Sequence, residues 1–214
     1  MKRTDIIILG VNGNCIDIAD SVEQLASRGD SVSVQGFLDD DPSVQGTTVA
    51  GYPVLGRLVD ASRFPGARFV CGIGSPRSFH RKPEILKSAG VPDGDWVTII
   101  HPAASVSRHV NIGAGVVLLA GCVVGARVRL GQHVMVLQNS TISHDSVIGD
   151  SSVIATGVCV SGMVTVGSNC YLGSNCSIRE GVRIGDGALV GIGAAVIHDV
   201  GAGTVVVGNP ARPR

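Results

Sequence analysis

The chain has 214 residues, and its 17 lysines and arginines balance its 17 aspartates and glutamates. Because no net charge attracts nucleic acid or an anionic membrane, we expect neither as a partner. Aromatic residues make up only 3% of the chain and glycines number 30, so we expect a core of small aliphatic side chains in narrow, regular packing. No apolar run approaches the length of a membrane span, and "MKRTDIIILG" leads into a strand without a cleavage-like site, which favours a cytoplasmic protein.

The first hundred residues alternate between strand-like and helix-like segments. "DIIILG" predicts a first strand, and residues 15–29 carry apolar side chains at helical spacing before they end on Gly29. Strands that alternate with helices in this way indicate a small parallel α/β domain of the Rossmann-like kind, which we place at residues 1–100. The remaining predicted elements are strands at 31–41, 67–74 and 96–102 and a helix at 75–90.

Polar residues and glycines gather where three of these strands end. In parallel α/β units ligands bind at the carboxyl ends of the strands, which here are residues 10–14, 39–41 and 72–75. The first turn reads G-x-x-G instead of G-x-G-x-x-G, and Asp39 follows Gly13 by 26 residues (39 − 13), so the dinucleotide motif is weak. These turns fit a nucleotide site and ordinary α/β connections equally well.

The rest of the chain repeats with a period of six residues. Sixteen positions, spaced by six from Val106 to Val196, are all aliphatic. The residue two places before each is Ala, Val, Cys or Ser, and the residue three places after is Gly, Asn or Asp in eleven of the sixteen cases. These last types tolerate the left-handed backbone that a sharp corner requires. The pattern predicts short strands and corners in coils of 18 residues, stacked about 4.8 Å apart as an all-β parallel β-helix over residues 101–214.

The hexapeptides resemble the left-handed β-helix of the hexapeptide-repeat acyltransferases, and the left-handed winding is expected from that resemblance alone. Six further segments follow one another in a characteristic order: "IIILGVNGN", "GFLDDD", "GIGSPRSFHRK", "IIHPAASVS", "SHDSVIGD" and "VVVGNPAR". In this order the chain is similar to the nucleotide-sugar acetyltransferases of the bacillosamine and perosamine type and to the related sialic acid O-acetyltransferases. The resemblance implies a nucleotide-sugar-binding domain at residues 1–100 and an acyltransferase domain with a C-terminal tail at 101–214.

The pair His144 and Asp145 is the strongest candidate for chemistry. His109 and His133 fall on the corner position of the repeat, where a solvated side chain is expected, and Asp145 occupies the same position, so a turn residue is the alternative for it. His144 lies one place earlier, and one coil onward (144 + 18) is Gly162. An imidazole suits a general base, and an amide free of side-chain cover suits the charge that develops on a carbonyl oxygen.

The resemblance implies a role for each of these residues. It makes His144 the base, Asp145 its orienting partner and the Gly162 amide the donor to the carbonyl oxygen. No serine or cysteine stands beside His144 as an obvious nucleophile, so we expect direct transfer without an acyl-enzyme, with acetyl-CoA as the co-substrate. The implied nucleotide-sugar contacts are Gly10, Asn12, Gly13, Asp39 and Asp40.

By the same resemblance, acetyl-CoA lies in a groove between neighbouring prisms, toward the C-terminal tail. A groove of this kind needs two prisms, so a homotrimer is expected. The alternative for the tail is a cap on the open end of the β-helix. The implied acetyl-CoA contacts are Gly162, Gly191, Gly208, Asn209 and Arg212.

Other functions stay open at this point. The acceptor that we expect first is the amine of a nucleotide-linked 4-amino sugar, and the second is a hydroxyl of sialic acid or another sugar. A zinc hydratase of the carbonic anhydrase kind uses the same prism, but it needs closely spaced histidines, and here the nearest pair, His101 and His109, is eight apart (109 − 101). A purely structural β-helix would need no N-terminal nucleotide pocket. The six cysteines form no C-x-x-C pair, so we expect reduced thiols that pack as small hydrophobic residues, and no metal site.

Overall fold

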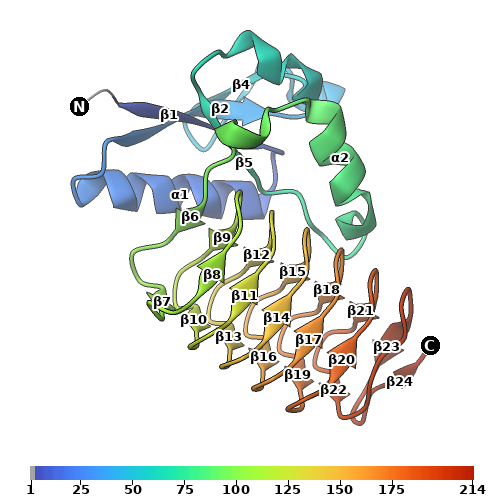
Figure 1. Ribbon diagram of the computed structural model, residues 1–214. Coiled ribbons are helices and arrows are strands. Elements are labelled where there is room, and N and C mark those ends of the chain that lie inside the picture. The colour runs from blue at the N-terminus through green and yellow to red at the C-terminus, as the bar shows by residue number, and fades with distance from the viewer. Residues whose placement is uncertain (1–2) are drawn as a thin grey trace.

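The computed structural model describes residues 3–214, so Met1 and Lys2 of the predicted first domain lie outside it (Figure 1). The N-terminal unit, residues 3–98, holds a five-stranded sheet in the order β3-β4-β2-β1-β5, parallel except for the β3–β4 pair. It is therefore an α/β unit, as expected, and its Rossmann-like character stays a prediction. Its elements are β1 (Thr4–Leu9), α1 (Gly13–Ser27), β2 (Val32–Leu38), β3 (Thr48–Val49), β4 (Tyr52–Gly56), β5 (Arg68–Cys71), α2 (Lys82–Ala89) and 3₁₀ helices at Pro42–Val44, Leu58–Arg63, Phe79–Arg81 and Asp93–Asp95.

Helix α1 begins directly after the first strand turns. Asn12 is its N-cap, and the Asn12 Oδ1 accepts a hydrogen bond from the Cys15 N–H at 3.3 Å, which satisfies one of the amides left free at a helix start. The helix buries Ile18 and Val22 against the sheet. Neither α1 nor any other helix within residues 3–214 has the length and apolarity that a membrane crossing requires.

Two parts of the N-terminal unit differ from the predicted elements. The second helix was expected over residues 75–90, but its first residues form a turn in which the Ser75 and Ser78 hydroxyls are 2.8 Å apart, and the α-helix starts only at Lys82. Pro83 in the first turn suits this start, because a proline lacks the N–H that continues a helix from the preceding turn. The β3–β4 hairpin was not predicted, since its strands are short and carry little alternation.

The remaining residues form a three-sided parallel β-helix, as predicted (Figure 1). From β6 to β22, each strand pairs in parallel with the strand 18 residues away, for example Thr141 with Cys159. The left-handed winding stays a prediction of the resemblance. Face one consists of β7 (Ser105–Val106), β10 (Val123–Val124), β13 (Thr141–Ile142), β16 (Cys159–Val160), β19 (Ser177–Ile178) and β22 (Ala195–Val196). Face two consists of β8 (Asn111–Ile112), β11 (Arg129–Leu130), β14 (Val147–Ile148), β17 (Thr165–Val166) and β20 (Arg183–Ile184). Face three consists of β6 (Ile99–Ile100), β9 (Val117–Leu118), β12 (Met135–Val136), β15 (Val153–Ile154), β18 (Tyr171–Leu172), β21 (Leu189–Val190), β23 (Val205–Val207) and β24 (Arg212–Pro213).

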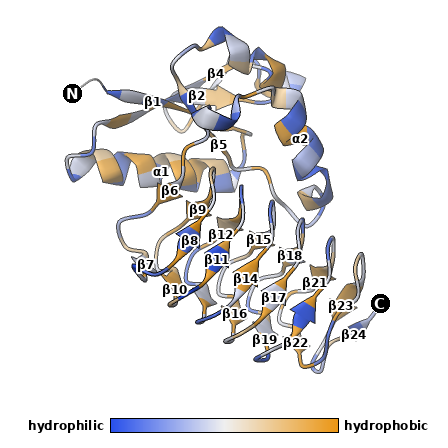
Figure 2. Cartoon of the chain, in the orientation of Figure 1, coloured by the Kyte–Doolittle hydropathy of each residue, from blue (hydrophilic) through white to orange (hydrophobic). Residues whose placement is uncertain are grey.

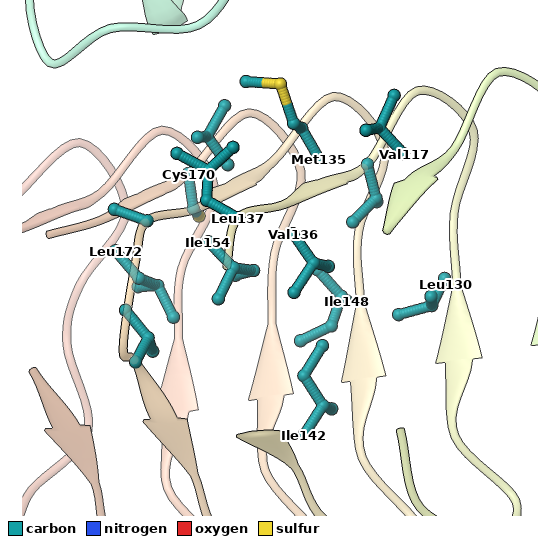
Figure 3. Close-up of a cluster of buried hydrophobic side chains, with 14 of the residues drawn as sticks. Val117, Leu130, Met135, Val136, Leu137, Ile142, Ile148, Ile154, Cys170 and Leu172 are labelled. Atoms are coloured by element: carbon teal, nitrogen blue, oxygen red, sulfur yellow. The ribbon is translucent and has the colours of Figure 1, made fainter. Parts of the chain in front are cut away.

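The aliphatic residue of each hexapeptide fills the interior of the prism. From Leu118 to Val196 all fourteen of these side chains are buried, none more than 3% exposed. Figure 3 shows several of them pointing toward one another from different faces, and Figure 2 shows the apolar strands that carry them. Burying one such side chain contributes about 1.5–3 kcal/mol, so the repeat itself is the main source of stability. Five of the six cysteines are buried and all six are free, so these thiols pack as expected, with Cys159 the exposed exception.

The corner position adopts the predicted left-handed backbone. Fourteen of the sixteen corner residues have positive φ, the exceptions being His109 and Asp199. Even residue types that rarely adopt positive φ do so at this position, such as Arg127 with φ of 60° and Met163 with φ of 57°. A left-handed conformation costs a non-glycine residue about 1 kcal/mol, and stacking against the neighbouring coils offsets this cost.

The N-terminal unit packs on the outer side of face three (Figure 1). Met135 and Val153 point outward from that face, yet both are fully buried. A Cβ on Gly74 would lie 2.7 Å from the Val153 Cγ2, so the loop after β5 approaches this face as closely as only a glycine allows. The rings of Phe79 and Tyr171 extend the contact, with centroids 5.7 Å apart.

His133 lies at this junction and is not the solvated corner residue that its position predicts. The expectation holds for His109, which is exposed, whereas His133 is only 9% exposed because the Trp96 ring packs against it at 4.5 Å between centroids. The Lys82 Nζ, itself fully buried, donates to the His133 carbonyl at 2.7 Å. Burial, and then the nearby Lys82 charge, lower the pKa of His133 to about 4.

Replacing His133 with Asn tests this junction, because Asn adopts the left-handed corner readily, as Asn139 and Asn169 do. In the unfolded wild type the imidazole takes up its proton near its ordinary pKa of about 6.5, whereas the folded pKa is about 4, so stability falls as the pH drops between these values. We expect the wild type to lose about 2 kcal/mol more than His133→Asn over this window. Urea unfolding near neutral pH and near pH 4 measures the difference, and equal losses would contradict it.

Candidate active site

His144 stands at the corner where the chain passes from β13 on face one to β14 on face two. The equivalent corners of successive coils stack in a column along this edge of the prism. We call this column the first corner; it comprises residues 126–127, 144–145, 162–163 and 180–181. The His144 Nδ1 lies 2.8 Å from the Asp145 Oδ2. An ionised carboxylate only accepts hydrogen bonds, so Nδ1 carries the proton and Nε2 is left as the basic nitrogen. The side chain of His144 is 56% exposed, so its Nε2 is open to a substrate.

Asp145 is held from a second side by Arg127, which lies one coil earlier (145 − 18). The Arg127 Nε donates to the Asp145 Oδ1 at 2.6 Å, and the Arg127 Nη2 donates to the Oδ2 at 2.8 Å. The Arg127 hydrogen bonds, and then the bond from His144, hold the pKa of Asp145 well below its usual range. The carboxylate therefore stays charged in mild acid, and it raises the pKa of Arg127 in turn.

Gly162 lies directly against the His144 ring, as the 18-residue register predicts. A Cβ built on Gly162 would lie 2.8 Å from the His144 Cε1 and 2.9 Å from the Nε2, so the ring occupies the space that a side chain would need. The Gly162 carbonyl accepts from the Gly181 N–H at 3.1 Å, whereas its own N–H has no acceptor within residues 3–214. A base and a free amide donor thus stand side by side.

The first corner is the edge of the prism opposite face three. Because the N-terminal unit covers face three, the interior of the β-helix separates it from His144 (Figure 1). His144 lies on an outer edge of the prism, where its side chain is open to solvent in the single chain.

Four of the five predicted nucleotide-sugar residues lie together at the carboxyl ends of β1 and β2. The Asp39 Oδ2 accepts from the Val11 N–H at 2.7 Å, which ties the second strand end to the turn that holds Asn12 and Gly13. Asn12 and Gly13 are both exposed at the start of α1. Gly10 enters the turn with φ of 104°, where a side chain would strain the backbone.

Asp40 points to another part of the unit. Its Oδ1 accepts from the Leu58 N–H at 3.0 Å, at the start of the 3₁₀ helix Leu58–Arg63. Its carboxylate therefore stabilises a helix end and does not join the cluster around Asp39. Within residues 3–214, no three or more His, Cys, Asp or Glu side chains are grouped to hold a metal ion.

The residues predicted to contact acetyl-CoA divide between two places. The Gly208 carbonyl accepts from the Ala195 N–H at 3.0 Å, so the tail with Asn209 continues face one beyond β22. This is four rungs above β13, about 19 Å along the prism at about 4.8 Å per rung, a length that suits an extended ligand. Arg212 is exposed in β24, beside this segment. Gly191 follows β21 instead, at the corner between faces three and one.

Comparison with known proteins finds similar solved structures. No protein-family model and no curated protein matches the sequence. Among solved structures, the acetyltransferase domain of PglB from Neisseria gonorrhoeae FA1090, in complex with acetyl coenzyme A, matches with a TM-score of 0.87 and 28% identity, over 99% of this chain and 100% of that chain. A histidine-to-asparagine mutant of perosamine N-acetyltransferase from Caulobacter crescentus, in complex with CoA and GDP-perosamine, matches with a TM-score of 0.84 and 26% identity, over 98% and 96%. WeeI from Acinetobacter baumannii AYE matches with a TM-score of 0.84 and 28% identity, over 99% and 100%.

The chain is therefore similar, over nearly its whole length, to hexapeptide-repeat nucleotide-sugar acetyltransferases. It is therefore an acyltransferase. In this acetyltransferase the residue that sequence reasoning missed is Arg127. Its signal was present, because the 18-residue register that pairs His144 with Gly162 also pairs Asp145 with Arg127.

Replacing Gly162 with Ala in this acetyltransferase puts a methyl group where the His144 ring now lies. The exposed ring has to turn away and release Asp145, so we expect acyl transfer to fall about 100-fold, a loss typical of a misplaced catalytic group. The rate of CoA thiol release measures the effect. Gly94→Ala is the control, because its added Cβ would meet no atom within 4 Å. A wild-type rate in Gly162→Ala would contradict a reactive position for the ring.

Proposed function

We propose that the enzyme transfers the acetyl group of acetyl-CoA to the amino group of a nucleotide-linked 4-amino sugar, with His144 as the general base. The observation that carries the proposal is the placement of the His144 Nε2 beside the bare Gly162, with the Nδ1 held by Asp145. The names of two matched structures agree with it, since one contains acetyl coenzyme A and another CoA with GDP-perosamine.

The proposed reaction is a single displacement. The sugar amine forms a bond to the thioester carbonyl carbon and gives up a proton to the His144 Nε2. The carbonyl oxygen gains charge and accepts a hydrogen bond from the Gly162 N–H, an interaction worth about 3–4 kcal/mol in comparable sites. The C–S bond then breaks, and the thiolate takes the proton back from His144 to leave as the CoA thiol. Asp145 stabilises the imidazolium between these two steps.

The nucleotide sugar is proposed to bind at the strand ends of the N-terminal unit. The Gly13 and Asn14 N–H groups at the start of α1 have no acceptor within the helix and favour a diphosphate. Asp39 supports this turn because its Oδ2 accepts from the Val11 N–H, while its Oδ1 accepts from the Asp41 N–H at 2.8 Å. Acetyl-CoA is proposed to run along face one between the first corner and the Gly208–Asn209 tail.

These two sites lie on opposite sides of one prism, so we propose that each active site combines two copies of the chain in a homotrimer. The N-terminal unit of one copy would present the sugar to the first corner of its neighbour. Face one offers a surface for such packing, because its outward residues Val123 and Cys159 are exposed in the single chain. Such faces are typically covered by an identical partner.

Thiol release from acetyl-CoA against UDP-, GDP- and dTDP-linked 4-amino sugars and free sialic acid tests the reaction. We expect turnover with one nucleotide-linked amino sugar and a loss of about 1,000-fold in His144→Ala, because the base is removed. His109→Ala, which removes an exposed histidine two coils below His144, is the matched control and should keep the wild-type rate. Turnover only with sialic acid would replace N-acetylation with O-acetylation, and full activity in His144→Ala would remove its role.

Mixing two inactive variants tests the composite site. We expect His144→Ala and Asn12→Ala homotrimers to be nearly inactive separately, because one lacks the base and the other the cap of α1. Co-expressed with different tags and purified as mixed trimers, they should recover about a third of wild-type turnover, since some interfaces then combine two intact halves. No recovery in mixed trimers would show that one copy supplies both halves.

A further inference from the structure

The carboxylate of Asp145 serves two partners at once. Its Oδ2 lies 2.8 Å from both the His144 Nδ1 and the Arg127 Nη2, and its Oδ1 accepts from the Arg127 Nε at 2.6 Å. This two-point contact between a planar guanidinium and a carboxylate is the strongest and most directional form of ion pair available to side chains. Arg127, on the preceding coil, therefore fixes the orientation of the Asp145 carboxylate that contacts His144.

We propose that Arg127 is a positioning residue for the His144–Asp145 pair and sets how strongly the Asp145 charge acts on the imidazole. The inference rests on the proposed role of His144. Arg127 does not touch the reacting atoms; it acts through Asp145 alone, and its own side chain is 67% exposed. An arginine at this corner also keeps a left-handed backbone at φ 60°, a cost that its contact with Asp145 helps to offset.

The electrostatic effect of Arg127 opposes that of Asp145. An unpaired carboxylate next to an imidazole favours the protonated ring, whereas a carboxylate already neutralised by a guanidinium favours it less. Arg127 thus weakens the electrostatic effect of the Asp145 carboxylate on the ring. Position and charge are two separable contributions of one residue.

Few other charges face His144. Asp145 is on its own coil and Arg127 on the coil below, while the coil above contributes the uncharged Gly162 and Met163. Two coils away, about 10 Å at about 4.8 Å per rung, lie Arg108 and His109 below and Glu180 above. The Arg108 Nε contacts the His109 Nε2 at 3.2 Å and does not contact Asp145, so Arg108 is a matched arginine for a control.

The experiment follows the imidazole of His144 by NMR as a function of pH in the full-length protein with labelled histidines. The His144 resonance is assigned by its absence in His144→Ala. In Arg127→Gln we expect the midpoint of the His144 titration to rise by about half a pH unit, a modest shift because the ion pair is exposed. Arg127→Lys keeps the charge without the two-point contact, so its midpoint should stay close to that of the wild type. Arg108→Gln should also leave the midpoint unchanged.

Activity provides the second readout. In thiol release with the accepted sugar, both Arg127→Gln and Arg127→Lys should lower kcat about tenfold with little change in KM, because Asp145 is no longer held in place. Only Arg127→Gln should also move the acid limb of the pH–rate profile upward. The pattern separates positioning from charge, and a merely structural role would move neither the titration nor the acid limb.

An unchanged His144 midpoint in folded Arg127→Gln, or an equal rise in Arg108→Gln, would overturn the proposal. The NMR titration needs no substrate, so it gives a result even if the acceptor differs from the proposed sugar. Full activity in His144→Ala would defeat the proposed function, whereas an inactive His144→Ala together with a wild-type titration in Arg127→Gln would defeat only the role of Arg127.

Discussion

The register of one coil upon the next is the constraint on which the rest of the structure depends. Parallel pairing between residues 18 apart places each corner residue directly above its counterpart. The Asp145 N–H donates to the Ala126 carbonyl at 3.0 Å, and the Met163 N–H donates to the His144 carbonyl at 2.9 Å, so the main chain itself fixes the column. Arg127 lies one coil below Asp145, and Gly162 lies one coil above His144, so the four residues come together through the register alone. No long loop has to fold back to bring them into contact.

The same regular packing determines where chemistry can occur. The interior of the prism is only as wide as its inward aliphatic side chains, and it is filled by them, so it holds no ligand cavity. Substrates therefore bind on the outside, and face three is already covered by the N-terminal unit. The first corner and the outer sides of faces one and two are what the chain leaves open. An outer edge excludes water only when another surface covers it, which explains why the proposed site requires a second copy.

Much of this arrangement could be predicted from the sequence, because the repeat is local. The period of six locates the inward residues and the corners, and the period of 18 places His144 against Gly162. What could not be predicted depends on distant side chains. His133 reads as a solvated corner residue, but Trp96 and Lys82 from the N-terminal unit bury it. Arg127 follows the register, but only its side-chain geometry reveals the two-point contact with Asp145. Asp39 and Asp40 are adjacent and chemically identical in sequence, so their different roles could not be predicted. Only the structure shows that Asp40 accepts from the Leu58 N–H and so points away from Asp39.

The continuation of face one into the Gly208–Asn209 tail has a further consequence. The distance between the first corner and the tail is set by a whole number of coils, so it changes only in steps of one rung, about 4.8 Å. Adding or removing one 18-residue coil between β16 and β22 would alter this length while leaving every local contact type intact. The number of coils would therefore set the length of the ligand that we propose to bind along face one.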